Sequence, residues 1–160
     1  MATLPHLLAQ HFRAAYFGGN WTERDLRGLL TNVSWQQAVT PAQDLNTIAV
    51  LVFHIHYYTK AQLRVLEGGA LAASDKLAFT PPPITSTADW QTLLQNTWAE
   101  AERFIERLEA LDPAQLHAPF CDPKYGTYYA NLQGNLEHLY YHLGQIALLK
   151  KLLKIEVSAG

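Results

Sequence analysis

The feature that most constrains the fold is the stretch 131–154, NLQGNLEHLYYHLGQIALLKKLLK. Its apolar residues recur at spacings of three and four, which predicts one long amphipathic helix. His138 and His142 are four residues apart, so both imidazoles project from one face within reach of a single ion. Asn135 and Gln145 share that row, which lies beside the apolar stripe. We therefore expect a helix that carries its histidines along the buried seam of a bundle.

Three further long segments have helical periodicity and signals at their ends. Each has a polar capping residue before its first apolar residue, and the first two stop at paired glycines. They begin after Thr3, after Asp44 or Asn46, and at Ser86 or Thr87, and they extend to Gly18-Gly19, Gly68-Gly69 and Leu108. Residues 21–32, with a cap at Thr22, and residues 34–39 predict short helices, and Asp112-Pro113 opens another helical turn.

The connection over residues 70–86 is too long for a tight turn and contains Pro81-Pro82-Pro83. We expect it to be a crossover along the bundle, between the second and third long helices. Four long helices, one long crossover and short connecting helices predict an all-α fold, a four-helix bundle. With 160 residues, the chain has room for one sizeable core, so a single domain over residues 1–160 is expected.

Composition excludes several classes of protein. Hydrophobic residues make up 49% and charged residues 16% of the sequence, which argues against disorder. A net charge of −2 gives no electrostatic basis for binding nucleic acid. No apolar run approaches the roughly 18 residues that span a membrane, and no basic amphipathic stretch suits a membrane surface. The lone cysteine, Cys121, fits a reducing compartment, and we expect a cytoplasmic protein.

A third metal ligand has to come from another helix, and His54 and His56 are the candidates. Both lie in the second long segment, which is apolar nearly all round and should be enclosed. Positions two apart on a helix diverge by about 200°, so only one of them can face the histidine pair. His56 shares its face with Lys60, which favours His54 as the inward residue and keeps His56 as the alternative. The remaining histidines are expected to face solvent: His6, His11 and His117.

The residues around these histidines resemble the DinB-like family, also called DinB/YfiT-like. One motif is NTIAVLVFHIHYY, in which Thr47 precedes His54 by seven positions. The other is HLYYHLGQI, which is similar to the HxxxHxGQ helix of the family. The order of helices, the short segments after the first helix and the Pro-bearing crossover also fit, so the resemblance covers nearly the whole chain.

The resemblance implies an up-down-down-up bundle with a divalent ion, zinc or nickel, held by three histidines at one end. His54 matches the second-helix ligand, and His138 and His142 match the pair on the last helix. Leu143 stands where many members have an arginine, so any role of that arginine has no counterpart here.

An ion held by three neutral imidazoles keeps its double charge and an open position, as in catalytic sites. It would make a bound water or thiol titrate near neutral pH, so either hydrolysis or transfer of a small thiol, an activity the resemblance implies, is expected. No carboxylate shares the row of His138 and His142, and Glu137 lies one residue off that row. A hydrolase usually needs a carboxylate near the water, so this shortage favours thiol transfer.

Polar and aromatic residues at helical spacing from the histidines are candidates to line a pocket for a small-molecule substrate. They are Tyr58, Tyr140, Tyr141, Gln145 and Asn135. A competing hypothesis is a non-catalytic bundle that binds small molecules or dimerises, with a metal that is structural or absent. A homodimer is expected in either case, because bundles of this size often leave an apolar helix face to pair.

Overall fold

The computed structural model describes residues 2–155. Within this range the chain forms seven α-helices and two short 3-10 helices, with no strand. One isolated antiparallel bridge joins Pro119 to Thr127 in the connection before the last helix. The expectation of an all-α fold is confirmed.

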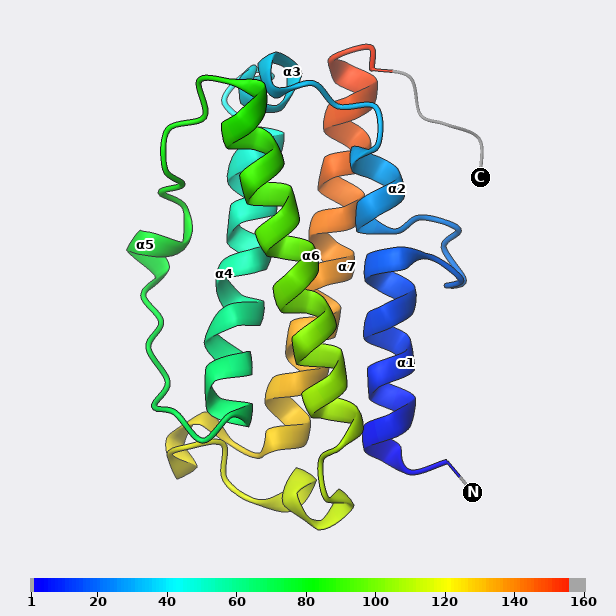
Figure 1. Cartoon of the computed structure of the whole chain (residues 1–160), viewed down its shortest axis with the longest axis vertical. Coiled ribbons are helices and arrows are strands. Elements are labelled where there is room, and N and C mark those ends of the chain that lie inside the picture. Colours follow the sequence, from blue (N-terminus) through cyan, green and yellow to red (C-terminus); the bar gives the residue numbers. More distant parts are fainter. Residues whose placement is uncertain (1, 156–160) are drawn as a thin grey trace.

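Four long helices lie side by side along the long axis of the molecule (Figure 1). They are α1 (Leu4–Phe17), α4 (Ile48–Leu66), α6 (Thr87–Glu109) and α7 (Tyr128–Leu152). In Figure 1, α1 and α7 run upward and α4 and α6 run downward. Both α4 and α1 pack against α6 and α7. The four helices therefore surround one common interior.

Side-chain caps explain where the long helices begin. Thr3 caps α1 and Ser86 caps α6, as expected, and each side chain accepts a backbone N–H of the first turn. The cap of α4 is Thr47 and not Asp44 or Asn46, because the Thr47 hydroxyl accepts from the N–H of Val50. The last helix starts at Tyr128, three residues earlier than expected, since Thr127 supplies its cap.

The short helices follow the same chemistry. Asp25, and not Thr22, caps α2 (Leu26–Leu30), so this helix begins later than expected. Ser34 and Gln37 form a reciprocal capping box at the start of α3 (Trp35–Val39). The 3-10 helices, Pro113–His117 and Pro123–Tyr125, each follow an aspartate whose carboxylate accepts a backbone N–H. They connect α6 to α7.

The interior is apolar and closely packed, which provides the main driving force for folding. The rings of Phe12 and Phe104 meet edge to face, with centroids 4.8 Å apart, and join α1 to α6. Two buried polar groups connect α2, and the turn between α2 and α3, to the long helices. The Trp90 indole N–H donates to the carbonyl of Val33 at 2.9 Å, and the Lys150 ammonium donates to the carbonyl of Leu29 at 2.6 Å.

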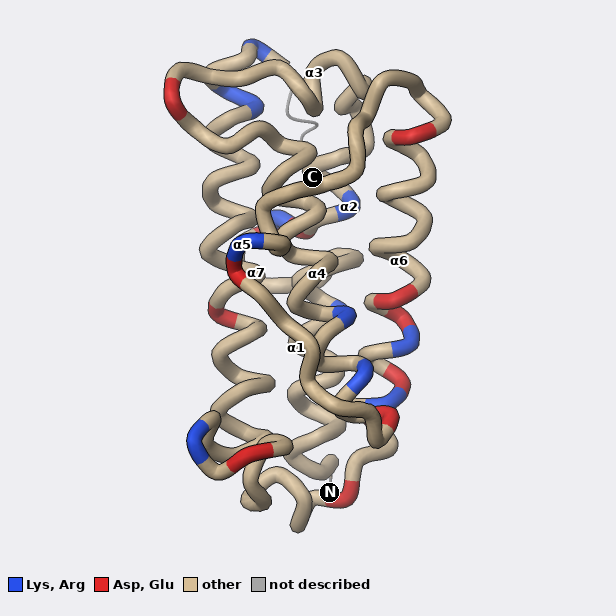
Figure 2. Tube along the Cα trace, turned by 90° about the vertical axis from the view of Figure 1, so that its left-hand side faces the viewer, with Lys and Arg blue, Asp and Glu red and all other residues tan. Residues whose placement is uncertain are grey.

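The crossover between α4 and α6 runs along α4 for the length of the molecule (Figures 1 and 2). Midway it forms a short helix that the sequence did not lead us to expect, α5 (Asp75–Ala78), which contacts α4. Tyr57 of α4 anchors its start, because the Tyr57 hydroxyl accepts from the backbone N–H of Ser74 at 2.8 Å. The crossover is thus held against α4 where the histidines lie.

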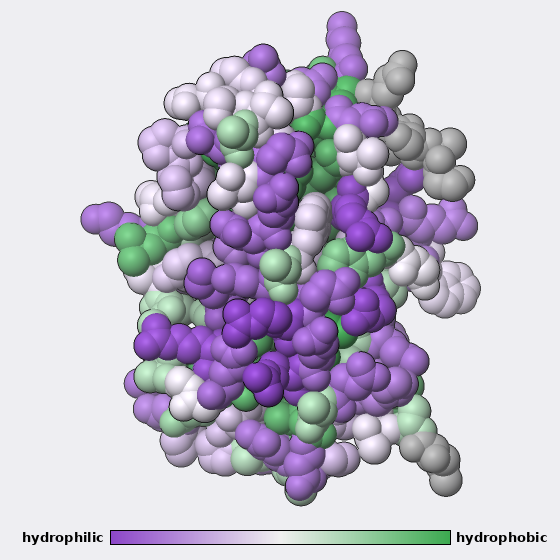
Figure 3. Space-filling view, in the orientation of Figure 1, coloured by the Kyte–Doolittle hydropathy of each residue, from purple (hydrophilic) through white to green (hydrophobic). Residues whose placement is uncertain are grey.

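The surface is mixed in character. Figure 3 shows mainly hydrophilic side chains on one face, with smaller apolar areas between them. Figure 2 shows acidic and basic positions interspersed along α6. No helix within residues 2–155 is both long enough and apolar enough to cross a membrane.

Candidate metal centre

Three imidazoles converge between α4 and α7. The Nε2 atom of His138 lies 2.8 Å from Nε2 of His54 and 2.9 Å from Nε2 of His142. The potential ligand atoms of the three side chains all lie within 4.8 Å of one another. His54 and His142 are buried and His138 is half-buried. His138 and His142 are near the middle of α7, whereas the resemblance implied one end of the bundle.

Two of the rings are oriented by acceptors behind them. The Nδ1 atom of His54 lies 3.3 Å from the carbonyl oxygen of Ala78 in α5, and Nδ1 of His142 lies 2.6 Å from Oε1 of Gln145. Carbonyl oxygens only accept, so both Nδ1 atoms carry the proton and both Nε2 atoms keep a lone pair. Of the three Nε2 atoms, only that of His138 can carry a proton. This one proton cannot form good hydrogen bonds to Nε2 of both His54 and His142. A cation would satisfy all three lone pairs.

The electrostatics favour neutral rings. Burial, followed by the neighbouring His142 and His54, lowers the pKa of His138 to about 4. Burial also lowers the pKa of His54, with His142 adding to the effect, and lowers the pKa of His142 despite its bond to Gln145. Neutral imidazole is the form that binds metals, so little proton competition opposes a metal at neutral pH.

Aromatic rings enclose the histidines. Phe79, which follows α5, stacks on His54 with centroids 3.9 Å apart. The Tyr58 ring meets both His54 and His138 edge-on, at 5.1 Å and 5.4 Å between centroids. The Tyr58 hydroxyl donates to Oδ1 of Asp75. Burial, followed by the bond to Asp75, raises the pKa of Tyr58 to about 12, so the phenol keeps its proton at neutral pH.

A cavity of about 460 Å³ opens beside His54 and His138. Tyr58, Asp75 and Phe79 line one side of it. On the other side, the amides of three residues form a chain of hydrogen bonds. Asn135 Nδ2 donates to Gln62 Oε1 at 3.0 Å, and Gln62 Nε2 donates to the backbone carbonyl of Asn131 at 2.8 Å. The cavity therefore has an imidazole end and a polar wall.

The five pocket candidates from the sequence are not all in one place. Tyr58 and Asn135 line this cavity, and Gln145 orients His142 from behind. Tyr140 lines a different cavity of about 430 Å³, beside α1 and the loop that carries Trp21. Tyr141 is 64% exposed, although its ring lies 5.0 Å from that of His142.

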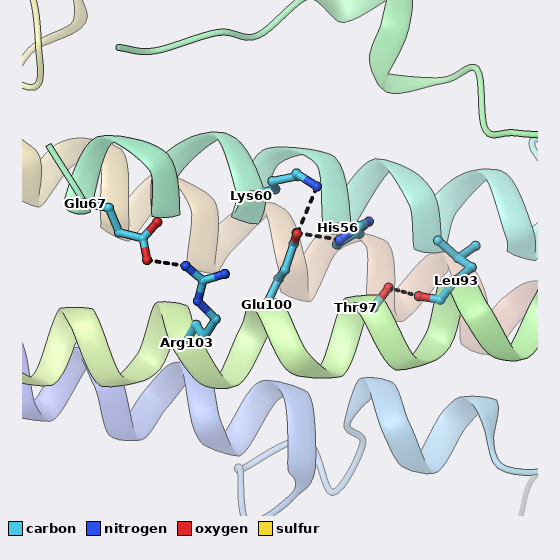
Figure 4. A network of polar contacts seen from close by, with 7 residues as sticks. All are labelled: His56, Lys60, Glu67, Leu93, Thr97, Glu100 and Arg103. Carbon is cyan, nitrogen blue, oxygen red and sulfur yellow. Dashed lines mark hydrogen bonds and ion pairs between the residues drawn. The ribbon is translucent and has the colours of Figure 1, made fainter. Parts of the chain in front are cut away.

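His56 points away from this centre, toward α6. Its Nε2 lies 2.6 Å from Oε2 of Glu100, and Lys60 Nζ lies 2.9 Å from Oε1 of the same carboxylate (Figure 4). Burial raises the pKa of Glu100, but hydrogen bonds from His56 and Lys60 outweigh it and hold the pKa below its usual value. His56 and Lys60 do share a face, as expected, yet His56 is only 8% exposed. This face therefore meets the half-buried carboxylate of Glu100 on α6, and not solvent.

The other histidines take no part in the centre. His11 and His117 are exposed, as expected. His6 is half-buried, and its Nδ1 pairs with Oε1 of Glu109 at 2.7 Å.

Sequence reasoning missed the contribution of the crossover, which brings Asp75, Ala78 and Phe79 to the histidines. The Ser74-Asp75 pair hints at a helical turn, but no local signal says that this turn docks at His54. Gln62 was also missed. It lies two turns after His54 on α4, a spacing that places it near the same face.

A sequence model described as the DinB superfamily matches residues 20–146, a range that contains all three histidines and the crossover. No curated protein and no solved structure matches the chain.

Proposed function

Because the chain belongs to the DinB superfamily, we propose that it is a metal-dependent enzyme in which His54, His138 and His142 hold one divalent ion, zinc or nickel. The observation that carries this proposal is the convergence of three Nε2 atoms, two of which are left unprotonated by the acceptors at Ala78 and Gln145. Imidazole nitrogen suits both metals, and three histidines with an open position are typical of catalytic sites.

When bound, such an ion lowers the pKa of a coordinated water or thiol and so supplies a nucleophile near neutral pH. The residues of this chain bind and orient a small substrate beside it. Tyr58 and Asn135 line the cavity, while Phe79 covers His54 on its ring face. We propose either thiol transfer or hydrolysis. The shortage of carboxylates that favoured thiol transfer holds for α7 alone, because Asp75 reaches the cavity from the crossover.

The same proposal includes the helix topology, the oligomeric state and the cellular location. The helix directions in Figure 1 support an up-down-down-up four-helix bundle. A homodimer is supported by exposed apolar residues at helical spacing on α7, namely Tyr141, Leu148 and Leu152. A cytoplasmic location rests on the single cysteine.

Metal analysis of protein purified without an affinity tag tests the site. We expect about one equivalent of zinc or nickel, which His142→Ala loses and the exposed control His117→Ala retains. A chelator should lower the melting temperature of the wild type, and added metal should restore it, because a ligand that binds only the folded state stabilises that state. Metal-free protein whose stability is unaffected by His142→Ala would contradict the site.

Catalysis needs a separate test. Apo and metal-loaded protein are compared on thiols paired with electrophiles, and on simple amides and esters. We expect turnover that depends on the metal in one of these sets. A bound metal without turnover in either set would favour the non-catalytic module that binds small molecules or dimerises.

A further inference from the structure

Among the described residues that line the cavity beside the histidines, one side chain carries a formal charge, and that charge is negative. The carboxylate of Asp75 lies at its edge, and none of the described residues that line it is a lysine or an arginine. An anionic group placed away from the metal end would therefore find no counter-charge, whereas a cationic group would find Asp75.

Asp75 is held in place while part of it stays available. Tyr58 donates to Oδ1, and Tyr57, the preceding residue of α4, accepts from the backbone of Ser74. Two adjacent tyrosines thus fix the start of α5 over the cavity. Asp75 is exposed, and within residues 2–155 no hydrogen bond or ion pair involves its Oδ2 atom.

The opposite wall of the cavity is rigid because backbone carbonyls fix the orientation of its side-chain amides. For the same reason, this wall presents hydrogen-bond acceptors to the cavity. Asn131 donates both of its N–H groups, to the carbonyls of Tyr125 and Thr127, and Gln62 donates to the carbonyl of Asn131. Gln62 Oε1 then faces the amide nitrogen of Asn135. In the described part of the chain, the side-chain oxygens of Asn131 and Asn135 accept no hydrogen bond.

A cavity whose free polar atoms are mainly oxygens is complementary to a ligand that brings donors. We propose that the substrate is a small molecule with two ends: a metal-binding group, such as a thiol, at His54 and His138, and an ammonium or similar cationic donor at Asp75. This inference rests on the proposed function, because the metal anchors the first end. Asp75 then determines specificity by its charge.

The test uses matched thiols on the cobalt-substituted, tag-free protein, with thiolate-to-cobalt absorption as the measure of binding. Cysteamine carries an ammonium, 3-mercaptopropionate a carboxylate and 2-mercaptoethanol no charge, on chains of similar length. Asp75 should attract the ammonium of cysteamine and repel the carboxylate of 3-mercaptopropionate, and each effect is roughly threefold in affinity at an exposed site. Together they predict that cysteamine binds roughly tenfold more tightly than 3-mercaptopropionate. Asp75→Asn should remove this preference, and Glu106→Gln, which neutralises an exposed carboxylate on α6, should keep it.

The thiols differ in acidity, and dividing the preference of the wild type by that of Asp75→Asn cancels this difference. If Asp75→Asn fails to fold, the preference of the wild type for cysteamine is measured at increasing salt concentration instead. Recognition of a charge weakens with ionic strength, whereas the acidity of a thiol changes far less. Stoichiometric cobalt with the same preference in both proteins, or a preference insensitive to salt, would overturn the inference and leave the metal site standing. Protein that takes up no cobalt would overturn both.

Discussion

Replacing Gln145 by alanine tests whether the hydrogen bond behind His142 prepares that imidazole for a metal. Gln145 Oε1 lies 2.6 Å from Nδ1 of His142, one turn earlier on α7, and the glutamine is half-buried. The substitution removes this acceptor and leaves all three histidines in place. His142 can then protonate on either nitrogen and rotate about its side-chain bonds, so its Nε2 lone pair is no longer directed at the other two rings.

Loss of such a partner typically lowers metal affinity about 10- to 100-fold, which corresponds to roughly 1.4–2.7 kcal/mol. The short distance and the partial burial place the expected loss toward the upper end of that range. The free energy of unfolding of the metal-free protein should change by less than about 1 kcal/mol, because the polar atoms left behind can reach water.

Competition with a chromophoric chelator measures the affinity, and urea unfolding of the metal-free protein measures stability. Gln145→Glu keeps an acceptor at the same position and should bind metal nearly as well as the wild type. Gln133→Ala is the matched control, since it removes an amide of α7 that bonds only to Glu137 in the described chain. A Gln145→Ala affinity within twofold of the wild type would refute the assigned role of this bond.

Two further predictions concern the packing of α4. Thr59→Val leaves the buried Tyr16 hydroxyl without the partner that lies 2.7 Å from it. We expect a loss of about 1–3 kcal/mol in urea unfolding, most of it recovered when Tyr16→Phe removes the other partner as well; additive losses would contradict this. Glu100→Gln should be less stable than the wild type at pH 7, because His56 and Lys60 favour the carboxylate. Since the folded state lowers the pKa of Glu100 from 4.5, its contribution is present above that pH and disappears as the pH falls through the lowered value. Unfolding curves from pH 7 to pH 3 should show the two proteins converging, and a constant gap would contradict the ion pair.

Local chemistry made the helices predictable. A few neighbouring residues are enough to predict the caps at Thr3 and Ser86 and the glycine that ends α1. The structure confirms all three. The errors at α4 and α7 arose where several polar residues precede the helix. Asn46 and Thr47 are both residue types that cap helices. Only the backbone conformation shows that Thr47 is the cap of α4.

The histidine centre was partly predictable for the same reason. The spacing of His138 and His142 is local to one helix, and the divergence of His54 from His56 follows from helix geometry. The partner of His56 was not predictable, because Glu100 is 44 positions away on α6. Likewise, no pattern within residues 70–86 shows that Asp75 and Phe79 dock at His54. These contacts depend on the path of the crossover in three dimensions.

The position of Ala78 behind His54 has a consequence for the order of folding. His54 and His138 are 84 positions apart, and the carbonyl that orients His54 belongs to a crossover that must already lie against α4. Closing loops of this length is slow compared with forming local helical turns. Before that docking, a nascent chain that met a metal would offer it at most the two histidines of α7. Tight binding would have to wait until α4, the crossover and α7 have docked, so a metal at this site would stabilise the completed fold and would not nucleate it.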